Sequence, residues 1–128
     1  MKISTREWIE SAESEMACAL RAYRARQHPS YDHVCFHAHL CVEKYLKAKL
    51  NEAWVKFTKT HELTELLAQV AAVEPSVADL QPQAEFLDAH AKLHQYPDRR
   101  ATKAQAQQAI KDCRTARSVM RTMFGLSD

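Results

Sequence analysis

Glycine is almost absent from this chain. Its 128 residues include a single glycine, Gly125, and only four prolines. A multi-stranded sheet needs many tight turns, and glycine and proline are the residues that form such turns most readily. Alanine, leucine, glutamate, lysine, arginine and glutamine are abundant instead, and all of them favour helices. The sequence therefore predicts an all-α protein.

Local signals predict where the first three helices begin. Residues 4–7, STRE, have the pattern of a capping box and predict a first helix that runs to about residue 25. Residues 29–32, PSYD, interrupt the chain and supply an N-cap for a second helix that extends to about Trp54. Thr60 is the expected cap of a third helix.

The last two helices have equally local signals. Residues 86–94 suit a fourth helix, which has to end before Tyr96-Pro97 because the residue that precedes a proline disfavours the helical conformation. A capping box at residues 102–105 begins a fifth helix, and Gly125 is its expected C-terminal stop. With no repeat or low-complexity tract, residues 1–128 are expected to form one domain, an antiparallel up-and-down bundle of about five helices.

Charge and hydropathy narrow the function classes. A net charge of +2 is too small for an overall nucleic-acid signature. Residues 99–121 nevertheless hold seven Lys or Arg residues and a single acid, Asp112, which indicates either an RNA-facing surface or a solvated helix face. No apolar run is long enough to cross a membrane, and the N-terminus lacks the apolar stretch of a signal peptide. Four cysteines without a dense disulfide pattern then indicate a cytoplasmic protein.

The segment HVCFHAHLC, residues 33–41, concentrates histidine and cysteine and suggests metal binding. On a helix, at about 100° per residue, Cys35 and His39 point one way whereas His33 and His37 point roughly the opposite way. A tetrahedral zinc site needs three or four ligands that converge on one point. Neither pair is sufficient alone.

Completing a metal site would take a ligand from another helix, for instance His90 or His94, which form a further pair at i and i+4. No HExxH or CxxC motif marks such a site. Lys44 also places a positive charge beside the His33/His37 pair. The sequence therefore predicts core and surface roles for these side chains, no metal and no other cofactor.

The second predicted helix is apolar on nearly every side. A helix of this kind lies at the centre of its own domain, or packs one face on its own core and another face on a partner. The second alternative predicts a homodimer. The apolar residues are Val34, Phe36, Ala38, Leu40, Cys41, Val42, Tyr45, Leu46 and Trp54.

Three short motifs resemble a known family. Residues 35–48, CFHAHLCVEKYLKA, resemble the second-helix signature of HEPN domains, commonly written FHAQQAVEKALKA. Residues 58–63, TKTHEL, resemble the KTHDL that begins their third helix, and Tyr96-Pro97-Asp98 resembles the YPD before their last helix. The resemblance implies a small helical bundle that typically dimerises. Many HEPN domains are encoded beside a minimal nucleotidyltransferase, and several are ribonuclease toxins or nucleotide-binding modules.

The resemblance implies one catalytic candidate, His94. HEPN ribonucleases share an Arg-x4–6-His motif, in which the arginine holds the scissile phosphate and the histidine acts as acid or base. His94 matches the histidine, but residues 87–89 are Leu, Asp and Ala, so the arginine is missing, and Lys92 is too close in sequence to replace it. The sequence therefore favours a dimeric nucleotide-binding or interaction module. The alternative is a metal-independent ribonuclease toxin with a degenerate site.

Tyr96 is a candidate for modification. His94-Gln95-Tyr96 is similar to the His-x-Tyr ending of toxins that are paired with nucleotidyltransferases. In those toxin–antitoxin pairs the transferase silences the toxin by adding AMP to the tyrosine. The resemblance thus implies a nucleotidyltransferase as a partner, and a nucleotide or RNA as a ligand.

Four further side chains are ligand-binding candidates. Glu43, Lys44 and Lys47 either pair with neighbours at i and i+4 or line a dimer cleft. His61 is expected in the first turn of the third helix, where it either bonds locally or touches a ligand.

Overall fold

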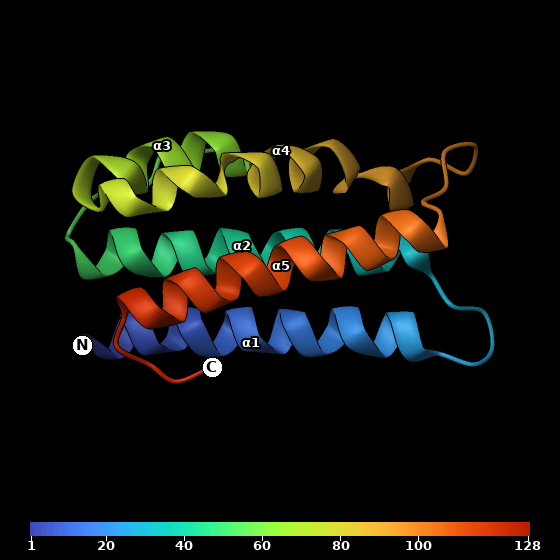
Figure 1. Cartoon of the computed structure of the whole chain (residues 1–128), viewed down its shortest axis with the longest axis horizontal. Coiled ribbons are helices and arrows are strands. Elements are labelled where there is room, and N and C mark those ends of the chain that lie inside the picture. The colour runs from blue at the N-terminus through green and yellow to red at the C-terminus, as the bar shows by residue number, and fades with distance from the viewer.

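The structure, a computed structural model, describes all 128 residues and contains helices but no strand. Five α-helices form an antiparallel bundle (Figure 1), which confirms the all-α prediction. Two short 3-10 helices precede and follow the fourth α-helix. The elements are α1 (Ile3–Arg24), α2 (Tyr31–Glu52), α3 (Leu63–Val73), η1 (Pro75–Leu80), α4 (Gln81–His90), η2 (Leu93–Gln95) and α5 (Lys103–Met123).

α2 is the central helix of the bundle. It packs against α1, α3, α4 and α5, and most of its apolar side chains belong to a core cluster of 27 buried residues. Full burial of a side chain such as Leu46 or Leu50 stabilises the fold by about 1.5–3 kcal/mol. The central position therefore explains most of the apolar surface of α2 without a partner.

Several predicted helix ends are confirmed. Ser30 is the N-cap of α2 and accepts a hydrogen bond from the His33 amide. Thr102 and Gln105 form the predicted capping box of α5. Gly125 follows α5 with a φ of +73°, a conformation that glycine adopts at little cost.

Other predicted ends are wrong. α1 begins at Ile3, with Lys2 at its N-cap and no side-chain cap. Thr5 is buried and donates instead to Glu52 at the end of α2, so residues 4–7 form no capping box. α4 already ends at His90, and η2 replaces its predicted last turn.

The start of α3 also differs from the prediction. Its N-cap is Glu62 rather than Thr60, and neither side chain caps the helix. The carboxylate of Asp88, on α4, accepts hydrogen bonds from the amides of Leu63 and Thr64. A neighbouring helix therefore caps α3.

A cluster of polar side chains joins α1, α2 and α5. Glu13 of α1 accepts hydrogen bonds from the Tyr45 hydroxyl at 2.6 Å and from Nε and Nη2 of Arg117, both at 2.7 Å. The bonds from Arg117 hold the pKa of Glu13 below its usual range, although burial acts in the opposite direction. The charge of Arg117 is therefore paired within the fold.

All four cysteines are free thiols. Cys35, Cys41 and Cys113 are buried. Burial, together with the nearby Asp32 carboxylate, raises the pKa of Cys35 to about 11, which keeps this thiol protonated and unreactive.

No helix of the chain is both long and apolar enough to cross a membrane.

Candidate functional site

His94 lies in η2, and its ring packs on α2. The centroid of the ring is 4.3 Å from that of Phe36 and 5.4 Å from that of His33. Nδ1 of His94 is buried and has no hydrogen-bond partner. Acid–base catalysts are usually oriented by a hydrogen bond from a neighbouring group. Aromatic packing, rather than a polar partner, therefore holds His94 in place.

Asp88 occupies the middle of the 87–89 window, in which the motif arginine was expected. Its carboxylate lies 2.9 Å from Nε2 of His39 and accepts hydrogen bonds from the amides of Leu63 (2.8 Å) and Thr64 (3.1 Å). Burial alone would raise the pKa of Asp88, but the bonds from His39 and the two amides hold it below its usual range. The carboxylate is therefore ionised, and it stabilises the positive end of the α3 dipole.

Three of the predicted ligand-binding candidates contact one another: Lys47 and His61 both lie against Glu43, which is buried on α2. Its Oε2 accepts a hydrogen bond from Lys47 at 2.9 Å and lies 3.3 Å from Nδ1 of His61. Nδ1 of His39 is 3.8 Å from the other oxygen. The Lys47 pair is the expected i, i+4 contact. His61 differs from the prediction because it precedes α3, is 80% exposed and reaches across to α2.

Lys44, the fourth candidate, belongs to a separate cluster. Its ammonium donates to Glu15 at 2.6 Å and to Ser11 at 2.8 Å, both on α1. Nδ1 of His37 lies 2.8 Å from the other oxygen of Glu15. Ligand atoms of Glu15, Cys18 and His37 lie within 4.8 Å of one another, so α1 offers His37 the additional ligands that the sequence did not reveal. The adjacent Lys44 ammonium already neutralises this carboxylate and repels a metal cation.

Tyr96 lies on the loop between η2 and α5. Its side chain is 43% exposed, and the guanidinium of Arg99 lies 5.1 Å from the centre of its ring. The hydroxyl therefore belongs to an accessible, positively charged segment rather than to the core.

These positions fit the family that the sequence motifs resembled. A model of the HEPN domain matches residues 5–123, from α1 to the last residue of α5. The chain belongs to the HEPN family. A crystal structure of an archaeal HEPN homologue resembles it with a TM-score of 0.72 and 24% sequence identity, over 96% of this chain and 98% of that chain. This likeness shows the shared bundle fold. No curated protein matches the chain.

Sequence patterns did not reveal the role of Asp88 in this HEPN domain. Its bond to the Leu63 amide crosses 25 positions of the chain, and the acid does not precede α3 as a local cap would. The contacts of Glu15 cross between two helices in the same way, at separations of 22 and 29 positions. Such pairs form only when the bundle brings the helices together.

Proposed function

We propose that this HEPN domain is a homodimeric binding module, which acts with a nucleotidyltransferase partner, and not a ribonuclease. Asp88 carries the proposal. HEPN ribonucleases hold the scissile phosphate with an arginine in this window, whereas a carboxylate repels a phosphate. Both oxygens of Asp88 also already accept hydrogen bonds within the fold. The other two residues of the window, Leu87 and Ala89, offer no charge.

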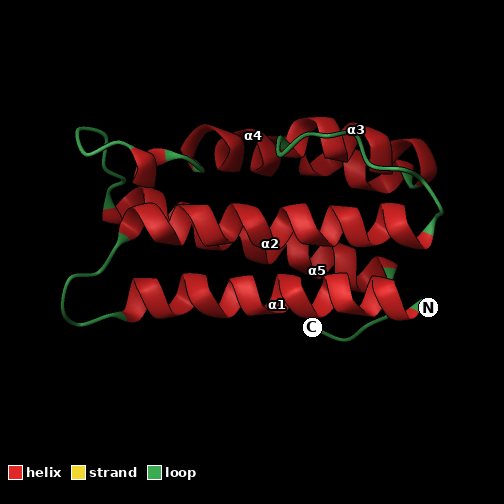
Figure 2. Cartoon of the chain, turned by 180° about the vertical axis from the view of Figure 1, so that it is seen from behind, coloured by secondary structure: helices red, strands yellow, loops and turns green.

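The surface proposed for the dimer is the open face of α2, formed by Phe36, Leu40, Lys44 and Lys47. Seen from behind, α2 lies between α1 and the layer of α3 and α4, and no helix covers its front (Figure 2). Phe36 and Leu40 are half-buried and lie outside the core cluster. A second copy related by a two-fold axis would place the same apolar pair against itself.

The position of His94 supports the same surface. Its ring packs on Phe36, so it lies at the edge of the open face. HEPN domains commonly dimerise, and in their ribonucleases the two histidines face each other. Here a dimer through α2 would bring two His94 residues near the interface without the arginines.

The first prediction tests the absence of ribonuclease activity. Expression of the chain in a bacterial host is expected to leave growth and total RNA unchanged, because residues 87–89 supply no arginine to hold a phosphate for His94. Growth curves and RNA electrophoresis provide the measurement, with immunoblots to match protein levels. His94→Ala and a control on α4, His90→Ala, are expected to behave like the unmodified chain. Growth arrest that only His94→Ala relieves would show that the chain is a ribonuclease.

The second prediction concerns the partner. We expect the nucleotidyltransferase to add AMP to Tyr96, whose hydroxyl oxygen would attack the α-phosphorus of ATP, lose its proton to solvent and release pyrophosphate. The exposed ring and the adjacent Arg99, which attracts phosphate, support this site. Intact mass spectrometry after coexpression should show one AMP adduct that disappears in Tyr96→Phe and persists in the control Tyr31→Phe. An unmodified chain beside an active transferase would count against the partnership.

A further inference from the structure

A pocket lies between α1 and α5. The helix α5 packs on α2 on the side opposite to the open face (Figures 1 and 2). The volume of the pocket is about 460 Å³, in the usual range of about 300–1,000 Å³ for small-molecule sites. The lining combines cations, neutral polar groups and apolar side chains, and it contains no carboxylate. The residues are Leu20, Tyr23, Arg24, Gln107, Ile110, Lys111, Arg114 and Thr115.

The positive charge of this pocket is not neutralised within the fold. Arg117 and Arg121, farther along α5, both pair with Glu13. Arg24 and Arg114 form no ion pair and donate no hydrogen bond to a carboxylate. A guanidinium without a partner in a pocket that holds no carboxylate favours an anionic ligand, and its planar geometry suits a phosphate in particular.

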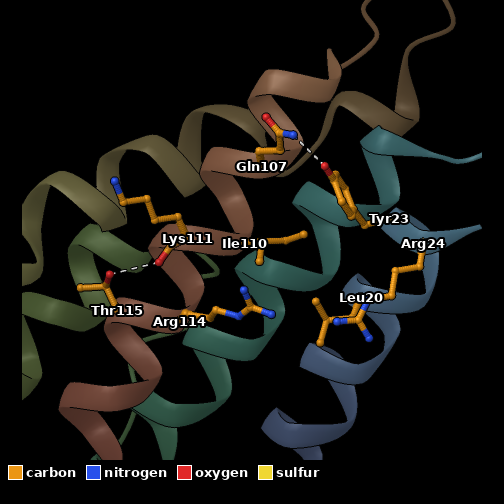
Figure 3. Close-up of a pocket in the computed structure, with 8 residues that line it drawn as sticks. All are labelled: Leu20, Tyr23, Arg24, Gln107, Ile110, Lys111, Arg114 and Thr115. Carbon is orange, nitrogen blue, oxygen red and sulfur yellow. Dashed lines mark hydrogen bonds between the residues drawn. The ribbon is translucent and has the colours of Figure 1, made fainter.

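The side chains are arranged around one space (Figure 3). Arg114 extends from α5 toward α1, and Arg24 lies along α1 beside Leu20, whereas Lys111 points away from both arginines. At one end of the pocket, Nε2 of Gln107 donates to the Tyr23 hydroxyl at 2.8 Å and holds the phenol ring in place. The pocket thus presents two guanidinium groups at one part and a fixed aromatic ring at another.

We propose that this pocket binds a mononucleotide, with its phosphate on Arg24 and Arg114 and its base against Tyr23. The side chains of Leu20 and Ile110 offer apolar contacts to the ring system, and stacking on tyrosine stabilises any base. This assignment names a ligand for the proposed binding module, and it rests on the proposed function only in one respect, namely that the domain acts by binding. It does not require the dimer, because no residue of the open face lines the pocket.

ADP binding, measured by isothermal titration calorimetry, tests the pocket directly. Arg24→Gln and Arg114→Gln are each expected to weaken ADP binding by tenfold or more, since each removes a charge-assisted hydrogen bond to the phosphate. Lys103→Gln is the matched control, because it removes the same charge from α5 at an exposed side chain that does not line the pocket. We expect it to change the affinity by less than about threefold. Tyr23→Ala should also weaken the binding of ADP, but it should leave the ability of inorganic phosphate to compete for the pocket unchanged.

Three outcomes would overturn the assignment. One is the absence of saturable ADP binding, and another is an equal loss of affinity in Lys103→Gln and in the two arginine variants. The third is inorganic phosphate or a single-stranded oligoribonucleotide that binds as tightly as ADP, because the site would then recognise phosphate without a mononucleotide. Light scattering on the same samples separates the two proposals. A dimer that does not bind ADP refutes only the pocket, and a monomer that binds ADP supports the pocket while it refutes the dimer.

Discussion

Asp88→Ala is expected to lower the free energy of unfolding by about 3 kcal/mol, the largest single effect that we expect from a polar side chain in this fold. Loss of an N-cap acceptor alone costs about 0.5–2 kcal/mol. The substitution also removes the carboxylate that pairs with His39, whose side chain is buried, and leaves the imidazole without this partner. Both losses occur at the contact that joins α2, α3 and α4.

Urea denaturation and thermal unfolding provide the measurement. For a chain of this length, a loss of 3 kcal/mol corresponds to a decrease in Tm of about 10 °C. Asp79→Ala is the matched control, because Asp79 is exposed in η1 and its carboxylate makes no hydrogen bond. The control should change the stability by less than about 0.5 kcal/mol. Equal stabilities of the two variants would contradict the capping role of Asp88.

The effect of Asp88 should also depend on pH in one direction. The pKa of Asp88 is lower in the folded chain than in the unfolded chain, so the unfolded state binds the proton more readily. The stabilisation is therefore complete above the unfolded pKa of about 3.9 and is lost as the pH falls through the lower folded-state value. The difference in stability between the unmodified chain and Asp88→Ala should narrow below about pH 4. A difference that stays constant down to pH 2 would refute this explanation.

The helices could be predicted where their signals are local. The caps of α2 and α5 are side chains that accept hydrogen bonds from amides only three positions away, and both caps were predicted correctly. The predicted starts of α1 and α3 were wrong because Thr5 donates a hydrogen bond to Glu52, and because Asp88 takes the place of a local cap. These partners are 47 and 25 positions away, which no local pattern can show.

The candidate sites show the same limit. His94 was predicted from its motif, but its contact with Phe36 depends on how η2 packs on α2. The basic character of residues 99–121 was visible in the sequence, with two alternative interpretations. Only the structure separates Arg117, which pairs with Glu13, from Arg114, which remains unpaired in the pocket between α1 and α5. Composition reveals the charge, whereas packing decides which charges remain available.

Leu40→Lys is expected to convert the dimer into a monomer. In a two-fold interface each substitution occurs twice, so two ammonium groups would be buried near each other in place of an apolar contact. A penalty of about 4 kcal/mol raises the dissociation constant by roughly a thousandfold. Leu40 is half-buried and lies outside the core cluster, so the lysine should leave the fold of each chain intact.

Light scattering at micromolar concentration, with circular dichroism to verify the helices, measures this effect. Ile3→Lys is the control, because it makes the same apolar-to-cation change at a side chain that is 78% exposed and lies in the first turn of α1, which contacts the C-terminal end of α2. We expect the mass of two chains for the unmodified protein and for Ile3→Lys, and of one chain for Leu40→Lys. An unmodified chain that is monomeric at this concentration would refute the dimer. A Leu40→Lys dimer would place the interface elsewhere, and the half-buried pair of Phe36 and Leu40 would then need a different partner.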